Sequence, residues 1–331
     1  MKRQLSRRDF VKSSLIASAG LPLAMNAQSP APPPASSPPP SNPPAAAPDK
    51  MPTGRIGGEE FSRLILGGNL IGGCAHSRDL AYVATLARRY NTPAKIRETL
   101  EVAEAHGINA INTHATQDNT TIFEHWKNGG KIKWFAQVGV DSDGGYSQID
   151  KAVDEGAAGL HVWGNVADSL LRQNKTDKIG QMVKLIKDKK HPAGVGAHDL
   201  RVIVECEKAG FDVDFYQKTF HSHDYYTAPR AGETEAVGPN DNSWCNDPQA
   251  VIDVFAKTAK PWIAFKILAA GAIPPLAAFP YAFTNGADFI LVGMFDWQVE
   301  ENAKLARRVL RVASGPNSKR TRPWYGGNAA T

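Results

Sequence analysis

Short apolar runs and amphipathic runs alternate along the chain from about residue 63 to residue 312. Runs rich in Val, Ile, Leu and Phe are typical of buried parallel strands, whereas apolar residues spaced three and four apart predict helices. Eight strand–helix pairs can be counted in this way. The predicted strands are 63–73, 108–114, 131–141, 158–165, 194–199, 213–221, 262–268 and 289–293. The predicted helices are 93–106, 120–127, 147–155, 166–189, 200–208, 248–258, 275–284 and 299–312.

Eight consecutive strand–helix pairs in about 260 residues predict an α/β fold, a single (β/α)8 TIM barrel. An open doubly wound sheet is the alternative, but no glycine-rich dinucleotide turn follows the first strand. A long polar segment, 223–246, follows the sixth strand. Loops of this length inside a compact domain are usually functional, so we expect a long loop after strand 6 that covers the site.

The first residues of the chain have the features of an export signal. Arg7 and Arg8 are followed by Phe10, by an apolar stretch at 15–23 and by small residues near Ala27. This arrangement resembles a twin-arginine signal peptide, which implies export by the twin-arginine translocase and a periplasmic or secreted location.

Composition divides the chain further. Prolines dominate the stretch after the signal, and such a stretch cannot bury apolar surface or form regular hydrogen bonds. The predicted organisation is a twin-arginine signal peptide at 1–27, a Pro-rich disordered linker at 28–54, the TIM-barrel domain at 55–315 and a basic, solvated C-terminal tail at 316–331.

Charge and cysteine content exclude several classes of protein. Removal of residues 1–27 takes away five basic residues and Asp9, which lowers the formal net charge from +5 to +1. A nearly neutral chain without clustered Lys and Arg is not expected to bind nucleic acid. The three cysteines form no CxxC pair. No second apolar run reaches the roughly 20 residues of a membrane helix, so we expect no membrane span in the mature chain.

Three histidines stand at the carboxyl ends of three predicted strands. Strand alternation turns His114, His161 and His198 toward the barrel interior, and Asp199 and His221 are close by in the predicted fold. Imidazoles that converge with a carboxylate suit Zn²⁺, Mn²⁺ or Fe²⁺. These five residues are therefore the predicted metal ligands, and His161 and His198 are also candidates for acid–base catalysis.

Two lysines interrupt apolar strand runs, Lys218 in the sixth strand and Lys266 in the seventh. A buried ammonium must be paired or deprotonated, because burying it alone is costly. Each lysine is a candidate catalytic group that holds a substrate oxygen or forms a Schiff base. The alternative is a structural ion pair with Asp214 or Asp296.

Polar and aromatic side chains provide the candidate substrate contacts. Alternation turns Asn112 and Gln137 inward, and Trp163, Tyr216 and the insertion's Trp244 offer flat faces for a sugar ring.

The segments FKILAAGAI and NGADFILVGMFD are similar to strands 7 and 8 of phosphate-binding barrels and class I aldolases. The resemblance implies that Lys266 is the reactive lysine and that Gly271 and Gly293 form a backbone anion cradle. Ala270 stands where a fuller glycine turn would occur, and the carboxylate of Asp296 would repel phosphate. A phosphorylated ligand is therefore not expected.

The segments SRLILGGNLIGG and KIRETLEVAEAHGINAINTH resemble the opening of aldo/keto reductases. That family ends its second strand with an aspartate and has a tyrosine a few residues later. Here Asn112, Thr113 and His114 occupy those places, and no tyrosine follows before Tyr146. The resemblance implies the fold but not the activity, so NADPH is not the expected cofactor.

The leading hypothesis is an exported TIM-barrel enzyme of lyase or isomerase type that acts on a small polyol or keto sugar, with a divalent metal as candidate cofactor. One alternative is an NADPH oxidoreductase of the aldo/keto reductase type, and the other is a non-catalytic periplasmic binding barrel.

Overall fold

The computed structural model describes residues 50–78, 80–229 and 242–325. The predicted signal peptide, most of the predicted linker and the middle of the long loop lie outside these residues. Within the described residues, no helix is long and apolar enough to cross a membrane.

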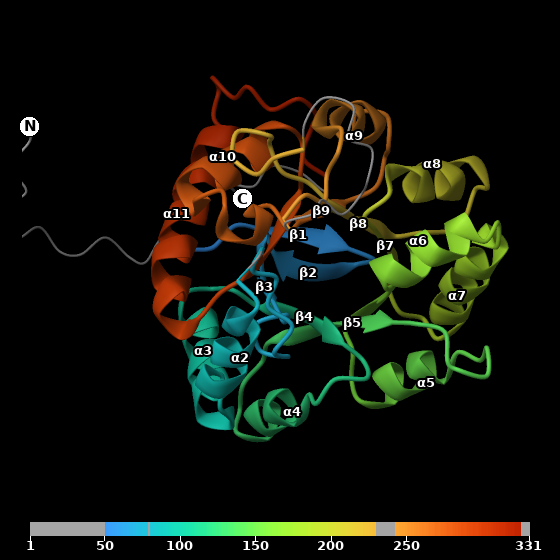
Figure 1. Ribbon diagram of the computed structural model, residues 1–331, viewed down its shortest axis with the longest axis horizontal. Coiled ribbons are helices and arrows are strands. Elements are labelled where there is room, and N and C mark those ends of the chain that lie inside the picture. Colours follow the sequence, from blue (N-terminus) through green and yellow to red (C-terminus); the bar gives the residue numbers. More distant parts are fainter. Residues whose placement is uncertain (1–49, 79, 230–241, 326–331) are drawn as a thin grey trace, which may run out of the picture. The chain divides into compact units, whose positions relative to one another are not determined.

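Eight parallel strands close into a barrel, with helices around the outside (Figure 1). The last strand, β10, pairs with the first, β3, and places Gly293 opposite Gly67. This confirms the predicted single (β/α)8 TIM barrel. The barrel strands are β3 (Leu64–Gly67), β4 (Ala110–His114), β5 (Lys133–Val138), β6 (Gly159–Val162), β7 (Ala193–Ala197), β8 (Phe215–Thr219), β9 (Trp262–Phe265) and β10 (Phe289–Gly293).

The helices follow the predicted positions closely, with two differences. They are α2 (Tyr82–Tyr90), α3 (Pro93–Ala105), α4 (Thr120–Lys127), α5 (Ser147–Asp154), α6 (Gly164–Arg172), α7 (Thr176–Asp188), α8 (Leu200–Lys208), α9 (Pro248–Phe255), α10 (Pro275–Thr284) and α11 (Asp296–Ser314). Helix α2 was not predicted. The single helix predicted at 166–189 is two helices, because Asn174 takes a left-handed conformation with φ of 54°.

Strand alternation separates two cores. Outward-facing residues pack under the helices, whereas Ile65, Phe135, Phe215, Ile263 and Phe289 fill the lower interior of the barrel. Glycine provides the necessary room, since a side chain at Gly194 would begin only 2.3 Å from the Phe215 ring.

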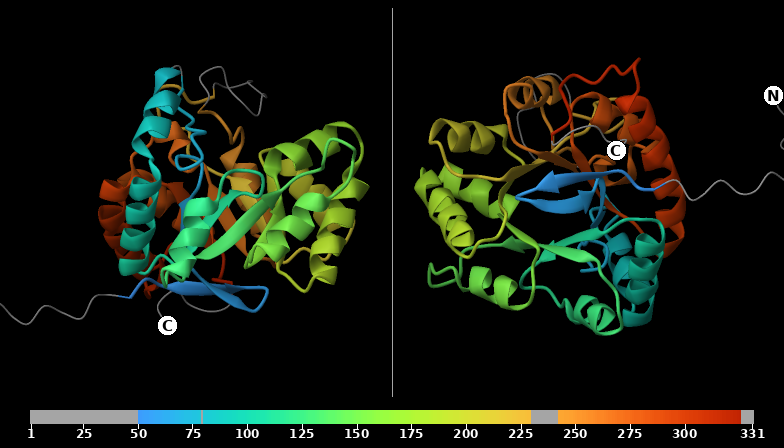
Figure 2. Two further views of the ribbon diagram at one scale, coloured as in Figure 1. Left: turned by 90° about the horizontal axis from the view of Figure 1, so that it is seen from below. Right: turned by 180° about the vertical axis from the view of Figure 1, so that it is seen from behind.

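A hairpin that was not predicted closes the N-terminal end of the barrel (Figure 2). It pairs β1 (Thr53–Ile56) with β2 (Glu59–Ser62) and inserts Ile56 and Phe61, both fully buried, into the interior core. The ordered domain therefore begins inside the range predicted as linker.

The C-terminal segment also packs against this end of the barrel. Arg320 and Arg322 form ion pairs with the buried Asp288 at 2.8 and 3.3 Å, and the Arg320 guanidinium lies 3.6 Å from the Trp324 ring centroid. The prediction of a solvated tail was wrong for these residues, because one buried carboxylate attracts both arginines.

Candidate active site

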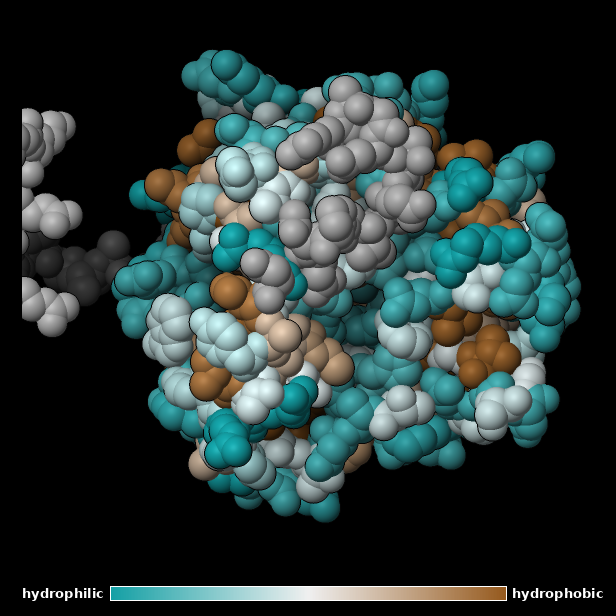
Figure 3. All heavy atoms as spheres, viewed as in Figure 1, coloured by the Kyte–Doolittle hydropathy of each residue, from teal (hydrophilic) through white to brown (hydrophobic). Residues whose placement is uncertain are grey.

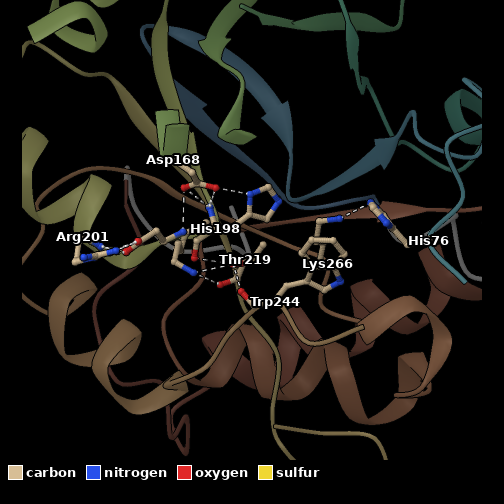
Figure 4. A network of polar contacts seen from close by, with 9 residues as sticks. His76, Asp168, His198, Arg201, Thr219, Trp244 and Lys266 are labelled. Atoms are coloured by element: carbon tan, nitrogen blue, oxygen red, sulfur yellow. Dashed lines mark hydrogen bonds and ion pairs between the residues drawn. The ribbon is translucent and has the colours of Figure 1, made fainter. Parts of the chain in front are cut away.

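A histidine–aspartate pair lies at the carboxyl end of strand β7. His198 Nδ1 is 2.8 Å from Asp168 Oδ2, and both side chains are buried (Figure 4). Asp168, on helix α6, also accepts the backbone N–H groups of His198 and Asp199. Asp168 Oδ2 accepts the hydrogen bond from His198 Nδ1–H, so the lone pair of the neutral imidazole is on Nε2.

Burial sets the charge of this pair. It lowers the pKa of His198 below its ordinary value, although the hydrogen bond to Asp168 acts in the opposite direction. His198 is therefore neutral near pH 7, the form that accepts a proton. His198 follows the carboxyl end of β7. Asp168 was not predicted, because nothing in helix α6 distinguishes it from an ordinary helical aspartate.

Lys266 follows the last residue of β9 and breaks the alternation of the strand. Its φ is 56°, in the left-handed region that residues other than glycine rarely adopt. Its Nζ lies 2.5 Å from His76 Nε2 and 3.7 Å from the Trp244 ring centroid. An unusual backbone conformation of this kind is often found at functional sites.

Trp244 lies between the His198–Asp168 pair and the Lys266–His76 pair. Its ring lies 5.4 Å from the His198 ring and 4.7 Å from the His76 ring, measured between centroids. Figure 4 shows His198 between Asp168 and Lys266, with Trp244 beside them. His76, in the loop between β3 and α2, was missed because only the folded chain brings that loop to Lys266.

His221 holds the returning end of the long loop instead of a metal. Its Nε2 accepts the backbone N–H groups of Trp244 and Cys245 at 3.0 and 3.1 Å, and its Nδ1 donates to Ser222 O at 3.0 Å. Burial lowers the pKa of His221 to about 4, so the ring is neutral. The returning backbone therefore depends on this imidazole.

Lys218 supports the same backbone from the outer side of β8. It is fully buried, which lowers its pKa, and its Nζ donates to Thr219 O and Oγ1 at 2.9 and 2.7 Å. Thr219 Oγ1 in turn donates to Trp244 O at 2.7 Å. The structure thus gives Lys218 a supporting position.

The predicted ion-pair partners of the lysines are occupied elsewhere, since Asp214 pairs with Lys187 and Asp296 with Lys95. Tyr216 also faces the helices and donates to Glu207 at 2.6 Å. Its prediction as a sugar contact was wrong, because the register of β8 turns Phe215 into the barrel and Tyr216 away from it.

Three polar side chains cross the barrel interior from neighbouring strands. Gln137 Nε2 donates to Asn112 Oδ1 at 2.8 Å, and Asn112 Nδ2 lies 2.9 Å from His161 Nε2. The other nitrogen of His161 lies 3.2 Å from Val162 O. All three residues face inward as predicted, but both nitrogens of His161 already have partners, and burial lowers its pKa to about 4.

The predicted metal ligands do not converge. His114 Nδ1 lies 2.8 Å from Thr116 Oγ1, and Asp199 begins helix α8 and pairs with Arg201 at 2.6 Å. The nitrogens of His161 and His221 are used as described above. Across the described ranges, no group of three His, Cys, Asp or Glu side chains has a metal-binding arrangement. The residues therefore do not fit the predicted centre.

Gly271 does not form the predicted anion cradle. The N–H of Gly271 donates to Leu268 O at 2.9 Å, so it is already used within a turn. A side chain at Gly293 would begin 3.5 Å from Leu70, which covers that position.

Comparisons with known proteins agree with this architecture. No family model and no curated protein matches the sequence. Among solved structures, a putative aldo-keto reductase from Pseudomonas aeruginosa matches with a TM-score of 0.54 and 17% identity over 79% of this chain and 97% of that one. An aldo-keto reductase from Bacillus halodurans matches with a TM-score of 0.53 and 11% identity over 78% of this chain and 95% of that one. The chain is a (β/α)8 barrel like those of aldo-keto reductases. At these identities the likeness concerns the fold alone.

Proposed function

We propose that this barrel is an enzyme that moves a proton on a small carbonyl compound, an isomerase or lyase of a polyol or keto sugar. The observation that carries the proposal is the His198–Asp168 pair beside Lys266 at the carboxyl ends of the strands, where TIM-barrel enzymes place their reacting groups. Trp244 adds a flat face against which a sugar ring would pack.

The chemistry follows from the charges of these groups. His198 Nε2 takes a proton from the carbon next to a substrate carbonyl, while the carboxylate of Asp168 stabilises the resulting imidazolium. Lys266 donates to the carbonyl oxygen and stabilises the enolate. Return of the proton from His198 to the former carbonyl carbon, with the hydroxyl proton passing to the former carbonyl oxygen, gives an isomer. When His198 instead gives its proton to a hydroxyl group on the next carbon, that group leaves as water and a carbon–carbon double bond forms. No metal takes part in this scheme.

We also propose that the enzyme is exported and works in the periplasm or outside the cell. The sequence at Arg7 and Arg8 supports this location. Replacing both arginines by lysine would leave the protein in the cytoplasmic fraction, and unchanged export of that variant would contradict the proposal.

The experiment is proton exchange in D₂O. Purified protein is incubated with a panel of keto sugars and sugar acids, and NMR follows the loss of C–H signals next to the carbonyl. His198→Ala is expected to slow exchange by about 100- to 10,000-fold, because it removes the general base. The matched control is His191→Ala, whose histidine lies before strand β7 at the opposite end of the barrel.

Three results would overturn the proposal. Exchange that is equally fast in the His198→Ala variant would remove the dyad from the chemistry. A rise in melting temperature with NADPH, together with oxidation of NADPH by the same compounds, would support a reductase instead. If no compound is turned over and His198→Ala leaves ligand affinity intact, the protein is a binding barrel.

A further inference from the structure

A groove of about 390 Å³ lies beside the barrel mouth, between the α6–α7 pair and the loop after β5. Its apolar walls come from Val140, Trp163, Val166 and Leu170, and the polar side chains of Asn165, Ser169 and Gln173 also line it. Figure 3 shows apolar side chains gathered at this place, with more polar residues between them and the hollow near the barrel axis. A groove of this volume is in the range that holds small ligands.

The groove exists because the helix predicted at 166–189 is interrupted. The left-handed Asn174 ends α6, and the N–H of Lys175 donates to Leu170 O at 2.8 Å. This turn fixes Lys175 at the edge of the groove, and Lys178 follows in the first turn of α7. No carboxylate is among the lining residues, so the groove has an apolar wall and a positively charged rim.

The same elements connect the groove to the proposed active site. Val166 and Leu170 are four residues apart and share one face of α6, whereas Asp168 lies on the other face and holds His198. The Trp163 ring lines the groove and also contacts the His114 ring at 4.5 Å, edge to face. Trp163 therefore lies between the groove and the side chains at the barrel mouth.

We propose that this groove binds an aryl group with a negative charge, carried as a substituent by the substrate of the barrel. Apolar walls stabilise the ring by removing it from water, and Lys175 and Lys178 attract an anionic group at its outer end. The substrate class is then an aryl conjugate of a polyol or keto sugar with a carboxylate or sulfonate on the ring. This substrate class depends on the proposed function, whereas binding of the aryl anion in the groove does not.

The test uses 1-anilinonaphthalene-8-sulfonate, whose fluorescence rises in apolar sites, as the probe. Binding is expected to saturate at one probe per chain. Val166→Glu places a carboxylate in the apolar wall, and we expect it to weaken binding by about tenfold or more. Val312→Glu, at an exposed valine on α11 outside the groove, is the matched control and is expected to leave affinity unchanged.

Charge is tested separately. In the Lys175→Glu, Lys178→Glu double variant, the affinity for the sulfonate probe is expected to fall by about threefold or more. The affinity for the neutral N-phenyl-1-naphthylamine is expected to stay the same. Equal affinity of the sulfonate probe for the wild type, the Val166→Glu variant and the double variant would contradict the proposal that the groove binds an aryl anion. Equal weakening of both probes by the double variant would overturn the preference for an anion.

The link to the reaction has its own readout. A phenyl glycoside with a ring carboxylate is expected to displace the sulfonate probe, whereas glucose is not. Failure of displacement would overturn the substrate class but not the groove. Because the His198→Ala variant is expected to bind the probe like the wild type, a failed groove and a failed reaction proposal are distinguishable.

Discussion

Three residues after strand β9 adopt left-handed backbone conformations although none is glycine. Lys266, Ala269 and Ala270 have φ values of 56°, 44° and 53°. Such a residue costs about 1–2 kcal/mol relative to its ordinary conformation. At Lys266 this conformation directs the ammonium to His76 and Trp244. The strained backbone at the proposed site therefore lowers the free energy of unfolding of the domain.

Ala270 allows the cost to be measured without touching the lysine. Ala270→Gly is expected to raise the free energy of unfolding by about 0.5–1 kcal/mol, because glycine adopts positive φ without strain. The measurement is urea unfolding followed by circular dichroism. Ala277→Gly, on the exposed face of helix α10, is the control with the opposite sign and should lower stability by about 1 kcal/mol. If both variants are less stable than the wild type, the backbone at Ala270 is not strained.

At the scale of elements, two imidazole rings hold the returning end of the long loop. His221 accepts two backbone N–H groups through Nε2, and protonation of that nitrogen would turn an acceptor into a donor. His223 donates to Cys245 O at 2.7 Å beside it. The position of Trp244 is therefore sensitive to acid.

This sensitivity has a defined sign. His221 and His161 have folded pKa values of about 4, below the ordinary value of 6.5, so the unfolded chain binds more protons between these values. Their contribution to stability is complete above pH 6.5 and is lost as the pH falls toward 4. As the pH falls from 7.5 to 5, each of the two histidines is expected to lower the free energy of unfolding by about 2 kcal/mol.

The measurement is urea unfolding at both pH values. His221→Gln keeps a side-chain acceptor but cannot be protonated, so its pH dependence should be smaller by about the share of one histidine. His191→Gln, at the other end of the barrel, should retain the full dependence. If the free energy of unfolding of His221→Gln depends on pH as strongly as that of the wild type, this imidazole does not hold the loop.

The strands and most helices were predictable because their pattern is local. Each barrel strand is a short apolar run followed by an amphipathic helix, and this period survives in the sequence alone. The break at Asn174 was missed although the apolar spacing stops there, since residues 172–178 are all polar before Ile179 resumes the pattern. Hairpin β1–β2 was missed because its two short strands lack a long apolar run.

The site was only partly predictable for a different reason. Alternation placed His198, Asn112, Gln137 and His161 inside the barrel, but it says nothing about which partner each side chain finds. Asp168 and His76 reach the site from a helix and a loop, where no strand register applies. Lys218 was predicted as a catalytic lysine or as the partner of an aspartate, whereas its Nζ donates to Thr219, and the strand pattern does not indicate such local partners.

At the scale of the whole domain, the N-terminal end of the barrel is held together by one carboxylate. Asp288 is fully buried, pairs with Arg320 and Arg322, and accepts the backbone N–H of Trp262 at 3.0 Å. The Arg63 guanidinium donates to Asp288 O and lies 4.5 Å from the Trp324 ring centroid. Residues from the first and last segments of the domain thus both contact Asp288.

Asp288→Asn is expected to lower the free energy of unfolding by about 3–5 kcal/mol, because it leaves buried guanidinium groups without their counter-charge. Arg320→Met should cost less, since Arg322 still neutralises the carboxylate. Chemical unfolding of the two variants tests this order. A larger loss in Arg320→Met would show that packing on Trp324 matters more than charge.

The hairpin under the barrel also bears on kinetics. With Ile56 and Phe61 filling the floor, a reactant reaches His198 from the mouth, and the product must leave the same way before another molecule arrives. Added product should therefore act as a competitive inhibitor that raises the apparent KM and leaves kcat unchanged.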